Sequence, residues 1–340
     1  LCDQGVTDSV LISASRDWNE FSISEDASKV TMKPSAIGGK VNLSLARFNR
    51  KLGPDPASVN SAMIGGIAAN NASGMTSGID YSCYSTLDSL RAVFSDGSIL
   101  DTSEDESVEN FMKSGNRIAE YIAELAVKIK ADQKLSDVIR EKYRIKNTTG
   151  YGLNSLIDFN NPKDIIQHLL IGSEGTLGFI SQITLKTVPD FPHKATAFVV
   201  FGSVFEACSF ILKLDSQKVN AAELFDSNSI KAVSSLHEIR KHIQKFDNSA
   251  AALLIELTAE STGELSENIA EVREYFKLSD ISNDPVFLDD PKEYSALWNI
   301  RKGLFPAICK SRTLPSTVII EDVCFKPENL AEGVTSLKEL

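Results

Sequence analysis

The chain reads Ile64-Gly65-Gly66-Ile67-Ala68-Ala69-Asn70-Asn71-Ala72-Ser73-Gly74 early in its length, and this run of small residues decides how the rest is interpreted. Glycine has no Cβ and tolerates positive φ, so the backbone can reverse tightly and bring N–H groups close to a ligand. Asn70 and Asn71 add amide donors and acceptors. The run predicts a loop that holds a flat, anionic cofactor, and its alternative interpretation is a glycine-rich surface turn.

Further turn-rich loops support the cofactor interpretation. One reads Gly172-Ser173-Glu174-Gly175-Thr176-Leu177-Gly178-Phe179-Ile180 and leads into an alternating strand over 183–188. Another reads Arg144-Ile145-Lys146-Asn147-Thr148-Thr149-Gly150-Tyr151-Gly152. Neither the dinucleotide pattern G-x-G-x-x-G nor the triphosphate pattern G-x-x-x-x-G-K-[ST] occurs, so the loops indicate a flavin site of another kind.

Five motifs follow one another along the chain: P-D-P-A-S (54–58), I-G-G-x-x-A-N-N-A-S-G (64–74), Y-S-T-L-D-S-L-x-A-V-F-x-D-G (84–97), K-N-T-T-G-Y (146–151) and G-S-E-G-T-L-G (172–178). In this order they resemble the FAD-linked oxidases of the vanillyl-alcohol-oxidase type. The chain most resembles D-lactate and D-2-hydroxyglutarate dehydrogenases, and among these the long bacterial form fused to a C-terminal iron–sulfur part. The resemblance covers nearly the whole chain.

This resemblance implies an α+β fold. It places an FAD-binding domain of two α+β lobes at 1–190 and a partial, ferredoxin-like cap domain for the substrate at 191–340. The segment Pro189-Asp190-Phe191-Pro192 supports that boundary, because paired prolines interrupt both helices and sheet ladders. The chain is interpreted as an internal fragment: 1–5 resemble the tail of the family's first cofactor loop, and Leu340 falls inside an expected helix.

The resemblance also implies non-covalent FAD, because no His or Cys adjoins a turn that would face the ring. The implied cofactor-binding residues are Pro56, Ala57, Ser58, Gly65, Gly66, Ala69, Asn70, Asn71, Ser73, Gly74, Glu174, Gly175, Thr176, Gly178 and Ile180. Carboxylates in tight glycine loops usually accept backbone N–H bonds, so Asp55 and Glu174 are expected to shape the loops rather than transfer protons. Asn147 and Tyr151 either touch the flavin or substrate, or pack between loops.

The reaction implied by the resemblance is oxidation of a D-2-hydroxy acid, in which a base removes the hydroxyl proton while hydride passes to the flavin. Arg301 matches the family's cap arginine, whose fork suits a substrate carboxylate; the alternative is a surface arginine in an ion pair. Lys302 and Arg312 are weaker candidates. Relatives specialised for 2-hydroxyglutarate carry a lysine where this chain has Ile320-Glu321, which favours a D-lactate-like substrate.

The catalytic base is not found in the sequence. The family uses a divalent metal and a histidine within an H-x-G-D-G-N-x-H segment, and this chain has no such segment. Its histidines, His168, His193, His237 and His242, lack the spacing of metal ligands, so no metal site is predicted here. The catalytic residues, the divalent metal and an iron–sulfur cluster are expected only beyond Leu340, and the fragment alone is expected to be inactive.

The composition of the chain limits the classes of binding partner that can be expected. Lys and Arg number 35 and Asp and Glu 46, and the formal net charge of −11 argues against nucleic acid. The five cysteines form no C-x-x-C pair, which fits a cytoplasmic setting, and no apolar run is long enough to span a bilayer, so membrane association would be peripheral, at the inner face. The expected partners are a D-2-hydroxy acid and an electron acceptor, either an iron–sulfur part or a quinone-linked chain.

Two other function classes stay open. A non-catalytic FAD-binding module or scaffold subunit would keep the loops without the metal segment. A flavin reductase of cell-wall sugar-nucleotide synthesis shares the fold, but would not be expected to carry the helix of Arg301.

Periodicity gives the secondary structure. Strands are predicted over 9–12, 21–24, 29–33, 195–201, 251–258 and 317–324. Helices are predicted over 40–52, 107–132, 205–214, 263–276 and 292–304, with a further amphipathic helix after Pro327.

Overall fold

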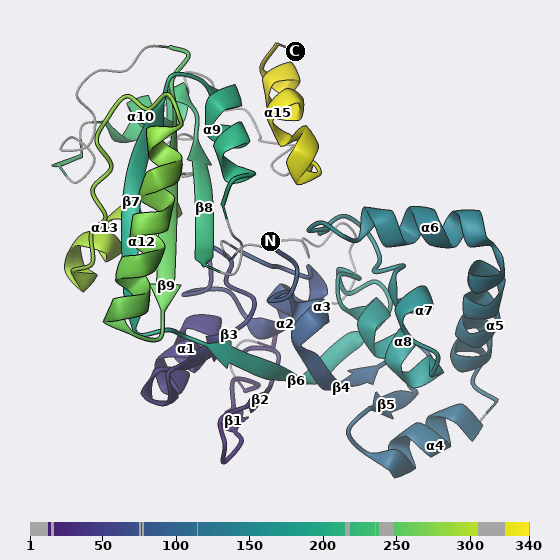
Figure 1. The fold of residues 1–340 in the computed structure, drawn as a ribbon. Coiled ribbons are helices and arrows are strands. Elements are labelled where there is room, and N and C mark those ends of the chain that lie inside the picture. Colours follow the sequence, from purple (N-terminus) through teal and green to yellow (C-terminus); the bar gives the residue numbers. More distant parts are fainter. Residues whose placement is uncertain are drawn as a thin grey trace. The chain divides into compact units, whose positions relative to one another are not determined.

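A computed structural model describes residues 13–14, 17–74, 76, 78–113, 115–214, 218–234, 236–237, 248–304 and 324–339. The chain divides into two compact units (Figure 1). The first comprises Leu1–Gly74 and Gly78–Asp190, and the second comprises Met75–Ser77 and Phe191–Leu340. None of the described helices has the length and apolar character needed to cross a membrane.

The first unit is built on a six-stranded antiparallel sheet of order β1-β2-β6-β4-β5, with β3 also paired to β6. Its strands are β1 (Phe21–Ile23), β2 (Lys29–Met32), β3 (Arg50–Leu52), β4 (Leu87–Val93), β5 (Ile99–Asp101) and β6 (Phe179–Pro189). Ile183 of β6 pairs with Met32 on one side and Leu90 on the other. The long β6, predicted from its alternating pattern, therefore organises the whole sheet.

The helices of the first unit form two groups. Near the loops lie α1 (Gly38–Leu45), η1 (Ala46–Phe48), α2 (Ile64–Ala69) and α3 (Cys83–Thr86); the remainder are α4 (Asp105–Lys113), α5 (Arg117–Ala131), α6 (Gln133–Lys142), α7 (Ser155–Asp158) and α8 (Pro162–Leu170). On α8, Ile166 and Leu170 join the core of the sheet, while Ile165 and Leu169 join the core formed with α5, α6 and α7. This helix thus links the helical part to the sheet.

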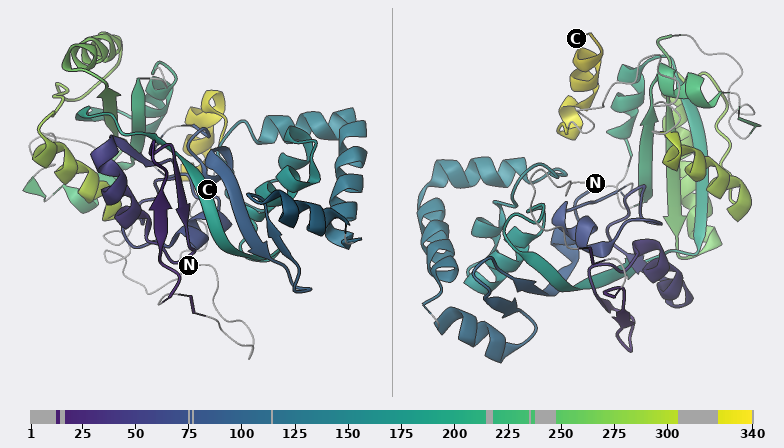
Figure 2. Two further views of the ribbon diagram at one scale, coloured as in Figure 1. Left: turned by 90° about the horizontal axis from the view of Figure 1, so that it is seen from below. Right: turned by 180° about the vertical axis from the view of Figure 1, so that it is seen from behind.

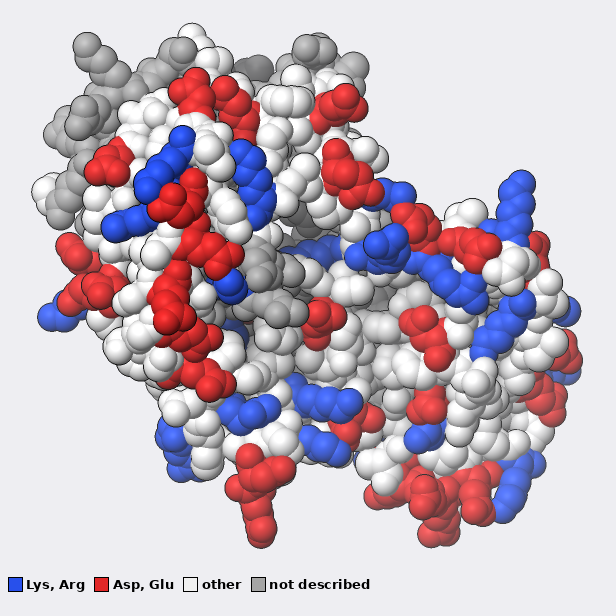
Figure 3. Space-filling model, viewed as in Figure 1, with Lys and Arg blue, Asp and Glu red and all other residues white. Residues whose placement is uncertain are grey.

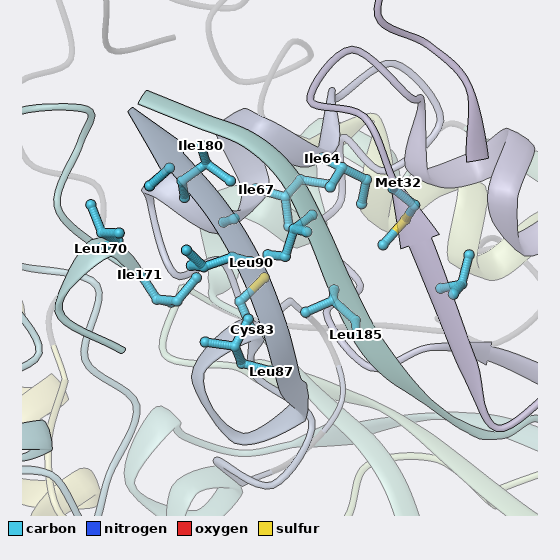
Figure 4. Close-up of a cluster of buried hydrophobic side chains, with 14 of the residues drawn as sticks. Met32, Ile64, Ile67, Cys83, Leu87, Leu90, Leu170, Ile171, Ile180 and Leu185 are labelled. Carbon is cyan, nitrogen blue, oxygen red and sulfur yellow. The ribbon is translucent and has the colours of Figure 1, made fainter. Parts of the chain in front are cut away.

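The core of the first unit gathers side chains from elements that are distant in sequence (Figure 4). Met32, Ile64, Leu90 and Leu185 are each no more than 2% exposed and belong to one cluster. Cys83 lies in the same cluster, and burial raises the pKa of its thiol to about 12. The thiolate needed for redox or metal chemistry is therefore disfavoured at this cysteine.

Within its described residues, the second unit has a three-stranded antiparallel sheet of order β7-β9-β8, with β7 (His193–Phe201), β8 (Val219–Phe225) and β9 (Ala251–Ala259). One core cluster joins the sheet to α9 (Val204–Ile211), α12 (Thr262–Lys277) and α15 (Leu330–Glu339), which follows η2 (Pro327–Asn329). The other joins the opposite face to α10 (Ser227–Val233) and α13 (Pro291–Lys302). α15 lies beside α9 (Figure 2). This strand order, reached through β7-α9-β8 and β9-α12, is that of a ferredoxin-like domain.

Two expectations of secondary structure were wrong, and strand β8 was missed. The helix predicted over 107–132 is two helices, because Gly115 takes φ +63° and Asn116 caps α5 by accepting the N–H of Ile118. The helix predicted over 40–52 ends early, since Asn49 turns left-handed at φ 54° and the chain continues as β3. Strand β8 was not predicted, because its sequence Val-Asn-Ala-Ala-Glu-Leu-Phe does not alternate and carries a register shift.

Several predictions fall outside the described residues. They include the strand over 9–12, all but the last residue of the strand over 317–324, and the tail of the first cofactor loop at 1–5.

Candidate functional site

Two of the glycine-rich loops meet at the end of α2. Gly172 N–H donates to the carbonyl of Ala68 over 3.0 Å, and Glu174 N–H donates to that of Ala69 over 2.8 Å. Asn70 Nδ2 donates to Glu174 Oε1 at 2.7 Å. The last turn of a helix leaves carbonyls without helical partners, and here the second loop donates to two of them, of which that of Ala68 also accepts the N–H of Asn71. Two segments predicted separately from sequence are thus one structural element.

The turns at this junction depend on left-handed backbone. Asn71 and Glu174 both have φ 52°, a region in which non-glycine residues are uncommon. Asparagine tolerates it best, and Asn71 is held there by its side chain: Oδ1 accepts the N–H of Tyr84 at 3.1 Å, and Nδ2 donates to the carbonyl of Asn147 at 3.4 Å. Asn71 therefore ties the first loop to two other segments.

The third loop contacts both of the others. Lys146 Nζ donates to the carbonyl of Gly74 at 2.7 Å. The hydroxyls of Tyr151 and Thr176 lie 2.9 Å apart. Of the two roles left open for this loop, packing between the other loops is thus observed for Tyr151 and for the carbonyl of Asn147.

The P-D-P-A-S turn lies against the end of the first loop. Asp55 N–H donates to the carbonyl of Ser73 at 2.7 Å, and Asp55 forms a β-bridge with Gly74. Gly74 has φ +99°, and a Cβ placed there would lie 1.8 Å from the carbonyl oxygen of Asp55. Only glycine fits such an approach. Pro56 is half-buried in this turn, and Ala57 and Ser58 are exposed beside it.

Not every predicted cofactor residue is free to face a ligand. A Cβ on Gly65 would lie 2.9 Å from Pro34 Cβ, and one on Gly178 would lie 3.3 Å from Leu170 Cδ2, so these glycines allow close packing. Ile180 is buried in the core of the sheet. Gly66, by contrast, has nothing within 4 Å of its Cβ position and is exposed.

The residues present fit a flavin nucleotide. The three loops and the P-D-P-A-S turn converge, and small residues are among their exposed positions: Ala57, Ser58, Gly66, Gly175 and Thr176, beside the larger Tyr151, Leu177 and Phe179. Backbone N–H groups and hydroxyls of this kind can approach phosphate or the edge of a ring closely. Glu174 already accepts the amide of Asn70, so this carboxylate shapes the loop, as expected.

Behind the loops lies a buried aromatic group that sequence reasoning missed. His168, 6% exposed, is stacked on Phe159 and meets the edge of the Tyr84 ring. Its Nδ1 lies 2.7 Å from the carbonyl of Asp164. Burial lowers the pKa of His168, and burial together with the Asp158 carboxylate, which accepts the Tyr84 hydroxyl, raises the pKa of Tyr84. Both groups are therefore neutral supports of the segment that holds Asn71.

In the second unit, Arg301 is paired with a carboxylate. Its Nε and Nη2 each lie 2.8 Å from Oε2 of Glu223 on β8. The side chains are 28% and 17% exposed, so the pair is partly shielded from solvent. Glu223 was not singled out from the sequence, because nothing local relates β8 to the last turn of α13. The predicted arginine is thus ordered, with one edge of its guanidinium occupied.

Other predicted residues lie apart from these groups. His193 is half-buried on β7 and His237 is exposed. Among the described residues, no three His, Cys, Asp or Glu side chains cluster as they would around a metal ion. Burial raises the pKa of Cys208 to about 11, whereas Cys324 is exposed. His242, Arg312 and Ile320-Glu321 lie outside the described residues.

The charge of the surface agrees with the composition. Acidic side chains follow α12 in a stripe (Figure 3), at Glu264, Glu267, Glu271 and Glu274. Some of this charge is neutralised locally, since Glu271 pairs with Lys218 and Glu274 with Lys277. A phosphate backbone would be repelled by such a face.

Comparison with known families agrees with both units. Residues 1–103 match the family described as FAD binding domain, and residues 191–340 match the one described as FAD linked oxidases, C-terminal domain. This chain belongs to the FAD-linked oxidases. FAD is the cofactor of this family, and the fold expected from the motifs is confirmed.

Curated relatives of this FAD-linked oxidase are dehydrogenases of D-2-hydroxy acids. The chain is 29% identical over 210 residues to the mitochondrial D-lactate dehydrogenase [cytochrome] of Arabidopsis thaliana, covering 60% of this chain and 33% of the relative. It is 22% identical over 356 residues to the D-2-hydroxyglutarate dehydrogenase of Pantoea ananatis, covering 99% of this chain and 34% of the relative. The chain therefore spans about a third of the length of each.

Solved structures share the fold. An alkyldihydroxyacetonephosphate synthase superposes with a TM-score of 0.53 at 17% identity, covering 87% of this chain and 45% of that one. At this identity the likeness concerns architecture alone.

Proposed function

We propose that this chain forms the FAD-binding and substrate-binding parts of a dehydrogenase of D-2-hydroxy acids. The observation that carries the proposal is the convergence of three loops and the P-D-P-A-S turn in the first unit, joined by the hydrogen bonds of Asn70, Asn71 and Lys146. The names of the relatives supply the substrate class. Residues 1–190 are assigned to FAD and 191–340 to the substrate.

Bound FAD would supply the electron sink for hydride. The chain's own residues would hold the cofactor through the fifteen positions implied by the motifs, among which Ala57, Ser58, Gly66, Gly175 and Thr176 are exposed. Gly65, Gly178 and Ile180 would act by shaping the loops. Arg301 would bind the substrate carboxylate by charge and by paired N–H donors. Lys302, half-buried beside it, remains a secondary candidate.

The substrate proposed is D-lactate or a similar monocarboxylate. The reason is in the sequence, where Ile320-Glu321 provides no lysine for a second carboxylate. Electrons would pass to an iron–sulfur part or to a quinone-linked chain. A cytoplasmic place, or a peripheral one on the inner face of a membrane, is proposed with it.

A second candidate is an FAD-binding module without catalysis. Such a module would keep the loops that bind FAD without the H-x-G-D-G-N-x-H segment, which does not occur among these 340 residues. Under either candidate the loops bind FAD, so the two differ only in what happens when substrate is added.

The test is an anaerobic visible spectrum of the chain reconstituted with FAD, before and after addition of D-lactate. We expect retained flavin that bleaches slowly or not at all in this chain, and rapid bleaching when the histidine-rich segment of a relative is supplied. Rapid bleaching by the chain alone would place the base among the residues present. Loss of flavin on gel filtration would refute the binding assignment. Retained flavin that stays oxidised in both cases would favour the non-catalytic module.

A further inference from the structure

The ion pair of Arg301 uses one edge of the guanidinium. Nε and Nη2 both point to the single oxygen Oε2 of Glu223, each at 2.8 Å. A guanidinium carries N–H donors on Nε, Nη1 and Nη2 in a rigid plane. The other edge, formed by Nη1 and the second N–H of Nη2, has no hydrogen-bond partner within the part of the chain that the structure describes. That edge has the geometry of a bidentate carboxylate fork.

Both partners of the pair come from anchored elements. Glu223 lies on β8 opposite Leu254 of β9, between buried Ala221 and Phe225. One turn before Arg301, the indole Nε1 of Trp298 donates to Thr196 Oγ1 of β7 at 3.1 Å. The carboxylate and the guanidinium are therefore held by the same sheet.

An unpaired arginine at this place would sample many rotamers, and ordering a long side chain costs conformational entropy. Glu223 removes that freedom before any ligand binds. The ion pair also holds the plane of the guanidinium in one orientation, so the remaining edge points in a fixed direction.

We propose that Glu223 is a positioning residue that orients Arg301 so that the free edge of its guanidinium receives a carboxylate from the substrate. This inference rests on the proposed function, since the ligand it concerns is a 2-hydroxy acid. Glu223 itself does not touch the ligand. Its charge is already matched by Arg301, and the incoming carboxylate binds the same cation from the other side.

The experiment uses the whole chain reconstituted with FAD, with D-lactate as the probe and propane-1,2-diol as the analogue without a carboxylate. Binding is followed by the ¹⁵N-labelled side-chain Nε–Hε resonance of Arg301, assigned by its loss in Arg301→Lys. We expect D-lactate, and not the diol, to shift this resonance. Glu223→Gln should lower the affinity for D-lactate by about tenfold, because the charged acceptor of Arg301 is lost. It should also broaden the Arg301 Nε–Hε resonance. Glu223→Asp should recover part of the affinity.

A matched control separates positioning from general stability. Glu271→Gln removes a different ion pair of the second unit, the one between Glu271 of α12 and Lys218, and should leave D-lactate affinity unchanged. Equal affinity of Glu223→Gln and wild type would overturn the inference while leaving the proposed function intact. Tighter binding by Glu223→Gln would also overturn it, since Glu223 would then be a competitor of the ligand. No effect of D-lactate on wild-type Arg301 would refute the arginine's proposed substrate role and the inference with it.

Discussion

The two units hold their candidate functional residues by different means. In the first unit, backbone groups take part in most of the contacts that join the loops: the carbonyls of Ala68 and Ala69 accept N–H groups of another loop, and the backbone of Gly74 lies directly against that of Asp55. In the second unit, a single pair of charged side chains, Glu223 and Arg301, links a strand to a helix. Backbone contacts restrict which residue types can occupy a position, so they leave a mark in the sequence. A side-chain pair leaves two ordinary residues that nothing local connects.

The largest effect is expected from a substitution at Gly74. Gly74→Ala should destabilise the first unit by about 3 kcal/mol or more and abolish FAD retention, because the new Cβ would meet the Asp55 carbonyl at 1.8 Å and φ is +99°. Stability is measured by urea unfolding, monitored by the fluorescence of Trp18 in a Trp298→Phe background. FAD retention is measured by flavin absorbance after gel filtration. The chain has two tryptophans, one in each unit, so each reports separately.

Gly78 provides the matched control for that substitution. It also has positive φ, +77°, but nothing lies within 4 Å of its Cβ position. Gly78→Ala should therefore cost only the backbone strain, about 1 kcal/mol, and should keep FAD. Equal losses at both glycines would mean that conformation, and not the contact with Asp55, decides the effect.

The side-chain pair of the second unit should respond in a different way. Arg301→Met should destabilise that unit by about 2 kcal/mol, because Glu223 is left with a shielded and unmatched charge. The double variant with Glu223→Met should regain most of this, since an apolar pair needs no charge compensation. Urea unfolding followed by Trp298 fluorescence in a Trp18→Phe background measures both. A double variant as unstable as Arg301→Met alone would show that packing, and not charge, sets the effect.

A side-chain contact within the first unit allows a sharper comparison. Glu174→Ala and Asn70→Ala each remove the 2.7 Å hydrogen bond between the loops. Each should lower the affinity for FAD by about fivefold, or about 1 kcal/mol. The double variant should lose little more than either single variant, because both remove the same bond. Fluorescence titration with FAD gives the affinities, with Glu109→Ala, an exposed ion-pair residue of α4, as control. Fully additive losses would mean that the two side chains act independently on the cofactor.

The sequence predicted those parts in which local chemistry is restrictive. The glycines and asparagines of 64–74 and 172–178 indicated two cofactor loops, and the structure joins them at α2. The predicted helices over 263–276 and 292–304 match α12 and α13 to within two residues at each end, whereas the alternating residues of 183–188 predicted only the second half of β6. In each case a pattern within a short stretch of the sequence is enough to predict the element.

The remainder depends on contacts between distant residues. Among the described residues, strand β8 pairs only with β9, and its pattern is interrupted at Asn220, so periodicity did not reveal it. The break between α4 and α5 lies in the left-handed turn of Gly115, whose effect on a helix depends on its conformation. Glu223 and His168 gain their roles only after the sheet and the helices have formed. No spacing rule relates 223 to 301.

The smallest expected effect concerns His168, which supports the first unit through side-chain packing behind the loops. Burial lowers the pKa of His168 below its ordinary 6.5, so the unfolded chain binds a proton more readily than the folded one. The free energy of unfolding should therefore fall as pH decreases through 6.5 and level off once pH is below the folded pKa.

The groups around His168 indicate how this would reach the loops. The Tyr84 and Phe159 rings face the imidazole, and the Asp164 carbonyl and the more distant Asp158 carboxylate oppose the shift without cancelling it. A charged imidazole would disturb Tyr84, whose N–H is bonded to Asn71, so FAD should be released in the same pH range. Urea unfolding with Trp18 fluorescence, repeated at a series of pH values, measures the stability. His168→Gln should flatten the dependence that is specific to this site, whereas His237→Gln, at an exposed position, should preserve it. A wild-type profile retained in His168→Gln would assign the pH dependence to other groups and leave the backbone loops insensitive to the packing behind them.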